Sequence, residues 1–132
     1  MQLIDWNATT TSGRGRTGTL YTIAKLGAAW AVSVDGDVVC AASNAAKSVD
    51  RAESLEALKH IVYGRATELD MPSLRRAGAI ATEMKTASDS MLDEPELAEP
   101  ERDAALAYSE HLDTLLAAIE AQARRRSAAQ LN

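Results

Sequence analysis

The sequence contains no phenylalanine, one cysteine and no long hydrophobic run. The single cysteine argues against a disulfide-stabilised protein, and the lack of a long hydrophobic run argues against a membrane-spanning one. Cys40 has no partner for an internal disulfide, so we expect a reduced, buried thiol and a cytoplasmic protein. Residues 1–6 lack a basic segment followed by an apolar run, so we expect no signal peptide. No stretch approaches the roughly 20 apolar residues of a membrane-spanning helix, so we expect no membrane contact.

Alanine supplies most of the apolar composition. Hydrophobic residues make up 46% of the chain, but 26 of them are alanine. Alanine buries little area and favours helices, which predicts a thin core and helices packed closely against each other or against a partner.

The charge is unevenly distributed. The net charge is −5, with about +1 on residues 1–67 and −6 on residues 68–132. A chain with so acidic a second half is a poor general nucleic-acid binder, because phosphate contacts require Lys and Arg. We therefore expect a protein partner or self-association, with nucleic acid disfavoured.

The first half has the composition of a β-sheet. All six valines lie within residues 32–62, and both tryptophans lie within the first 30 residues. Asp35-Gly36 between residues 30–34 and 37–40 predicts a hairpin with a two-residue turn, in which Val32 faces Val39 and Trp30 faces Ala41. Residues 19–26 predict the preceding strand, residues 3–6 could add a short edge strand, and residues 9–18 are expected to form a loop.

The second half has the composition of helices. Asp50 with Glu53 resembles a capping box, which predicts a helix over about 50–67. Asp70 before Met71 and Pro72 predicts the next helix start, and we expect the last helix over about 101–126. The expected fold is α+β: a small three-stranded antiparallel sheet plus a helix over residues 1–68, then a helical hairpin over residues 69–132.

A glycine-rich segment is the first candidate site. Residues 13–18 match the pattern G-x-G-x-x-G, but a strand rather than a helix is expected to follow, so a mobile polar loop is favoured over a nucleotide site. Arg14 and Arg16 in this loop could contact nucleic acid together with Trp6 and Trp30. The alternative is a solvated loop beside two core tryptophans.

No catalytic, cofactor or metal site is expected. Glu53, Glu56 and His60 share one helix face, but two carboxylates and one histidine on a helix are typical of an exposed surface. The spacing of the two histidines and the one cysteine specifies no nucleophile–base pair. We therefore expect no enzyme activity.

The last helix carries the predicted protein-binding residues. An apolar stripe occurs at helical spacing, and it either packs against the preceding helix or forms an interface. The acidic linker before it is either a functional surface, such as a mimic of DNA charge, or a solvated segment. The residues concerned are Tyr108, Leu112, Leu115 and Ile119 in the stripe, and Asp93, Glu94 and Glu96 in the linker.

The sheet residues also carry a resemblance. The patterns Tyr21-x-Ile23 and Trp30-x-Val32-x-Val34-Asp35-Gly36, followed by a helix over residues 53–62, resemble the three-strands-then-helix modules of AP2-type and integrase N-terminal DNA-binding domains. Such modules occur in uncharacterised actinobacterial and phage proteins, and the resemblance covers residues 2–66. It implies a phage-like or mobile-element accessory protein. Together with the acidic helices, it favours a non-enzymatic protein that inhibits a host enzyme or defence complex, with a DNA-binding module using Arg14 and Arg16 as the alternative.

Overall fold

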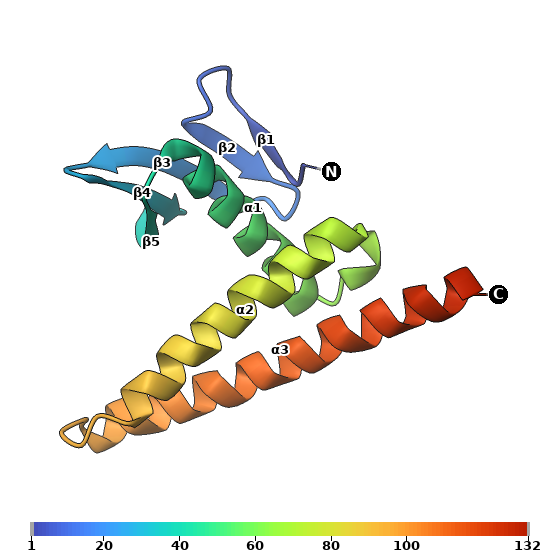
Figure 1. Ribbon diagram of the computed structural model, residues 1–132. Helices are drawn as coiled ribbons and strands as arrows, with labels where there is room; N and C mark the ends of the chain where they lie inside the picture. The colour runs from blue at the N-terminus through green and yellow to red at the C-terminus, as the bar shows by residue number, and fades with distance from the viewer. Residues whose placement is uncertain (1, 132) are drawn as a thin grey trace.

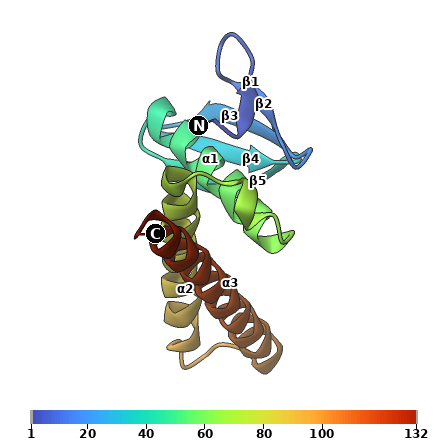
Figure 2. The same ribbon diagram turned by 90° about the vertical axis from the view of Figure 1, so that its right-hand side faces the viewer.

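The computed structural model describes residues 2–131 as an α+β fold in which a five-stranded antiparallel sheet precedes three helices (Figure 1). Helix α1 lies between the sheet and a pair of antiparallel helices, α2 and α3, that projects away from the sheet (Figure 2). The strands are β1 (Ile4–Trp6), β2 (Ser12–Gly15), β3 (Leu20–Leu26), β4 (Ala29–Val34) and β5 (Asp37–Ala42). The helices are α1 (Ala45–Val62), a 3-10 turn η1 (Ala66–Glu68), α2 (Met71–Leu92) and α3 (Glu99–Leu131).

The sheet has two strands more than the three expected. The α+β class is confirmed, but the segment expected to be a loop contains β2, which pairs with β1 on one side and β3 on the other. Only glycine fits at positions 13 and 15 of this strand, because a Cβ at either position would collide with a neighbouring residue. At Gly13 it would lie 2.6 Å from Ile4 Cγ2 and 2.9 Å from the carbonyl oxygen of Asp5. Glycine here serves close packing rather than mobility.

The β4–β5 hairpin has the predicted turn but a different register. Asp35 and Gly36 have φ angles of 49° and 94°, as a two-residue turn of this type requires. The expected pairs Val32–Val39 and Trp30–Ala41 are wrong, because Val32 pairs with Cys40 and Trp30 pairs with Ala42. On the other side of the irregularity, Ser33 pairs with Val38. Val39 is therefore the extra residue of a β-bulge, which redirects its side chain.

Helix α1 begins before the expected start. Asn44, not Asp50, is the N-cap residue, and its side chain accepts a hydrogen bond of 2.8 Å from the backbone N–H of Lys47. The proposed capping box is wrong because Glu53 lies in the middle of α1 and is buried.

The helical hairpin follows the prediction more closely. Asp70 caps α2 by accepting a 2.9 Å hydrogen bond from the backbone N–H of Ser73, and Pro72 lies in the first turn. Arg102 fixes the connection between α2 and α3, because its guanidinium donates to the carbonyl oxygens of Leu92 and Glu94 at 2.8 Å each.

The main core joins all three helices. It extends across the predicted boundary at residue 68, since Leu58 and Ile61 of α1 contact residues of α2 and α3. A second, smaller cluster lies between α1 and the sheet, around Tyr21 and Val32. The helical members of the main core are Ala57, Leu58 and Ile61 on α1, Leu74, Ala77, Ile80 and Ala81 on α2, and Leu112, Leu115 and Ile119 on α3.

Candidate functional site

Three polar residues of α1 that were expected on an exposed surface are buried: Glu53, Glu56 and His60. The carboxylate of Glu53 accepts hydrogen bonds from the backbone N–H groups of Leu3 at 2.7 Å and Ile4 at 2.9 Å. Burial raises the pKa of Glu53, and the two N–H donors oppose that shift. Glu53 therefore anchors the first strand to α1.

Glu56 anchors the turn after β2 in the same way. Its carboxylate accepts hydrogen bonds from the backbone N–H of Thr17 at 3.2 Å, from the Thr17 hydroxyl, and from the Tyr21 hydroxyl at 3.2 Å. A Cβ on Gly15 would overlap this carboxylate, so glycine at that position makes room for Glu56. Burial, followed by the charge of Glu56, raises the pKa of Tyr21.

His60 is buried without a hydrogen bond to either ring nitrogen within the described residues. Its Nδ1 lies 3.9 Å from Oε2 of Glu68, and burial lowers its pKa. Glu53, Glu56 and His60 hold no common metal site: among residues 2–131, no three His, Cys, Asp or Glu side chains are placed to share an ion.

Arg14 and Arg16 are exposed, but the structure does not bring them together with the tryptophans on one face. Arg14 lies opposite Asp5 in the sheet, and its guanidinium donates a 2.7 Å hydrogen bond to the carbonyl oxygen of Gly18. Trp6 lies opposite Gly13, one residue away, so it lies on the other face and packs on the cluster around Tyr21. No helix follows Gly18, so the glycine pattern lacks the helix N-terminus of a dinucleotide site.

The predicted apolar stripe of α3 is divided between core and surface. Leu112, Leu115 and Ile119 are buried against α1 and α2, as the packing alternative for the stripe expects. Their assignment as protein-binding residues stays a prediction. Tyr108 remains 43% exposed. The acidic residues Asp93, Glu94 and Glu96 are exposed in the connection between α2 and α3.

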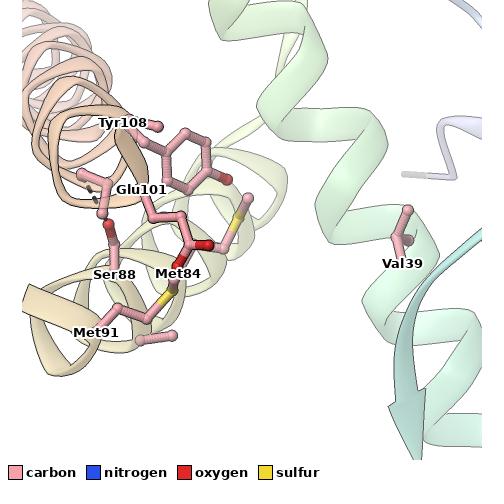
Figure 3. A pocket seen from close by; sticks show the side chains of 9 residues that line it. Val39, Met84, Ser88, Met91, Glu101 and Tyr108 are labelled. Carbon is pink, nitrogen blue, oxygen red and sulfur yellow. Dashed lines mark hydrogen bonds between the residues drawn. The ribbon is translucent and has the colours of Figure 1, made fainter. Parts of the chain in front are cut away.

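Tyr108 lines an apolar hollow of about 650 Å³ between the helical hairpin and the sheet edge (Figure 3). Both helices contribute residues at the spacing i, i+3, i+4, i+7, so each presents two turns of one face. Figure 3 shows Val39 on β5, across the hollow from Tyr108, Met84 and Met91. The lining residues are Met84, Ala87, Ser88 and Met91 on α2, Glu101, Ala104, Ala105 and Tyr108 on α3, and Val39 on β5.

Small residues form the floor of this hollow and large ones form its walls. Ser88 donates a 2.9 Å hydrogen bond to the carbonyl oxygen of Ala105, so α2 and α3 approach closely there. Met91 is 48% exposed and Val39 is 51% exposed, on opposite sides of the hollow (Figure 3). Large apolar side chains that gather on one exposed surface mark a binding site. The β-bulge accounts for the position of Val39 beside the hairpin.

A second hollow of about 220 Å³ adjoins the first and shares Val39, Met84 and Ala87 with it. It extends to α1, where Arg51 forms hydrogen bonds of 2.7 and 3.0 Å with Glu83 of α2. Cys40 lines it and is half-buried, not fully buried as expected. The two hollows form one surface, which we call the hairpin groove.

Most residues of the hairpin groove could not be predicted from the sequence. Tyr108 is among the predicted protein-binding residues, but Val39 was expected to pair regularly inside the sheet. The available signal was that the α2 stripe continues through Met84 to Met91, past the part that the α1 helix can cover.

Comparisons of this chain with protein-family models, with curated proteins and with solved structures found no match. The resemblance to AP2-type and integrase N-terminal modules therefore stays a prediction. None of the helices within the described part of the chain is both long and apolar enough to cross a membrane.

Proposed function

We propose that this chain is a non-enzymatic protein-interaction protein and that the hairpin groove is its docking site. The observation that carries the proposal is that Val39, Met84, Met91 and Tyr108 line one largely apolar hollow. Burial of such apolar surface by a partner stabilises the complex by about 25 cal/mol per Å² removed from water. Methionine also adapts its shape to different partners.

The position of the groove supports the same proposal. Its lining comes from β5 and the three helices, the helices pack together in the main core, and Cys40 of β5 packs on the cluster around Tyr21, so the site is formed before a partner arrives. Inhibition of a host enzyme or defence complex, which the sequence favoured, is one specific form of such docking. Identification of the partner as such an enzyme or complex would support inhibition as the function.

Photo-crosslinking tests the proposal. A benzophenone amino acid is placed at position 108 in the groove and, in a matched variant, at position 106 in cells that naturally produce the chain. Leu106 is 49% exposed on the same helix but does not line the groove, so it controls for exposure. We expect a protein adduct from position 108 and not from position 106. Equal adducts from both positions, or none from position 108, would contradict a docking site in the groove.

A further inference from the structure

We infer that the partner segment of the hairpin groove is a basic amphipathic helix, an inference that rests on the proposed function. The first argument is the layering of the helices. In the main core, α1 covers the pair formed by residues 74–81 of α2 and residues 112–119 of α3. Nearer the tip, residues 84–91 and 101–108 form the same kind of pair, but α1 reaches only the adjoining second hollow, where Arg51 and Leu55 lie beside Met84 and Ala87.

A partner helix would therefore complete the third layer that α1 begins. The two uncovered helix faces each run for two turns, about 10 Å at 1.5 Å per residue, which matches two turns of a helix lying along them. Met84 links the two regions, since it packs on the main core and also lines the groove. The partner's apolar residues would continue an existing core.

The β-bulge argues against the other regular occupant, an added strand. An extended peptide pairs with an edge strand through evenly spaced backbone groups. β5 is an edge strand, but the bulge at Val39 interrupts that spacing in its middle. β5 therefore contributes the Val39 side chain to the groove, and its backbone does not offer regular hydrogen bonds to an added strand.

Charge determines which helix fits. Residues 93–103 contain six acidic residues and one basic residue. The basic residue, Arg102, donates to the carbonyl oxygens of Leu92 and Glu94, and none of the six carboxylates forms an ion pair within residues 2–131. Glu101 lies in the lining itself, close to Met91 and Tyr108 (Figure 3). A partner helix with Lys or Arg beside its apolar face would supply the missing charges.

Titration with three designed peptides tests the inference. Each has about 18 residues, which is about five turns of helix. The first has leucines at i, i+3, i+4 and i+7 with lysines elsewhere, the second has the same composition scrambled, and the third has glutamates in place of the lysines. We expect the first to bind with a gain of helical circular dichroism and the other two to bind at least about tenfold more weakly.

Two pairs of variants locate the binding. Tyr108→Ser should weaken the first peptide at least about tenfold, whereas Leu106→Ser on the same helix should leave its affinity within about twofold. Glu101→Lys should weaken it more than Glu110→Lys, which makes the same charge change at an exposed position outside the groove. Equal losses within either pair would place the peptide elsewhere and overturn the inference.

Other outcomes also decide. The inference fails if the three peptides bind equally, if none binds, or if the chain sediments as a dimer that Tyr108→Ser dissociates, since a second copy would then fill the groove. The crosslinking experiment is independent of these peptides. An adduct at position 108 to a neutral, acidic or extended segment would overturn the basic helix and leave the docking site standing.

Discussion

Thr17 and Glu56 are joined by hydrogen bonds from both the backbone N–H and the hydroxyl of Thr17 to one buried carboxylate. These bonds, 39 positions apart in the sequence, fix the turn after β2 to α1. Since α1 also carries Arg51, which pairs with Glu83, and packs against α2 in the main core, it joins the sheet to the helical hairpin.

Glu56→Ala should lower the free energy of unfolding by about 3 kcal/mol, because it removes the shared acceptor of the Thr17 backbone N–H and the buried Tyr21 hydroxyl. Urea denaturation measures the change. Glu110→Ala on an exposed face of α3 is the matched control and should change stability by less than about 0.5 kcal/mol. Equal effects of the two substitutions would show that the buried carboxylate does not hold the turn.

Leu112→Ala should destabilise the chain by about 2–5 kcal/mol, because Leu112 is 1% exposed at the centre of the main core. Leu106→Ala, at an exposed position of the same helix, should cost less than about 0.5 kcal/mol. Thermal and urea unfolding measure both. If Leu112→Ala left the stability unchanged but abolished binding to a partner, Leu112 would be an interface residue instead of a core residue.

Local signals predicted the elements that depend on local chemistry. Asp35-Gly36 specified its turn and Asp70 specified the start of α2, because each forms its contacts within a few residues. The features that failed depend on distant contacts. Position 15 of β2 requires glycine because Glu56 approaches it from α1, and Val39 leaves the regular register at a bulge. Neither the approach of Glu56 nor the bulge at Val39 can be read from the sequence around these positions.

The candidate site divides in the same way. Helical spacing placed Tyr108 and Leu112 on one stripe but could not show where cover by another helix ends. The point at which this cover ends depends on where α1 crosses α2. The contacts of α1 with the sheet and the Arg51–Glu83 pair determine that crossing. The burial of Glu56 and His60 was missed because polar residues are usually exposed.

His60 should make stability decrease on acidification. Burial holds its pKa in the folded chain below the usual value, while Glu56 and Glu68 oppose this shift and Arg65 and Arg16 reinforce it. The unfolded chain takes up a proton near pH 6.5, so the contribution is present above about pH 6.5 and is lost as the pH falls toward the folded pKa. His60→Leu should reduce this loss in urea titrations between about pH 7 and 5.

The same substitution at exposed His111 is the control and should leave the pH dependence unchanged. If His60→Leu and the unsubstituted chain lose stability in parallel over this range, the buried ring is not responsible.

Duplex DNA should bind only weakly at physiological salt, because the net charge is −5 and Arg14 and Trp6 lie on opposite faces of the sheet. Fluorescence anisotropy with a labelled duplex at several salt concentrations measures this. Submicromolar binding that weakens steeply with salt and disappears in Arg14→Ala/Arg16→Ala would support the DNA-binding alternative instead.

The methyl resonances of the methionines give the most direct test of the hairpin groove. The chain is labelled with ¹³C-methyl methionine and added to an extract of cells that naturally produce it. Met84 and Met91 line the groove, whereas Met71 packs on the main core at the start of α2 and serves as the internal control. Docking in the groove predicts that the Met84 and Met91 resonances shift or broaden while the Met71 resonance does not. Unchanged Met84 and Met91 resonances under conditions in which the chain is bound by a partner would contradict it.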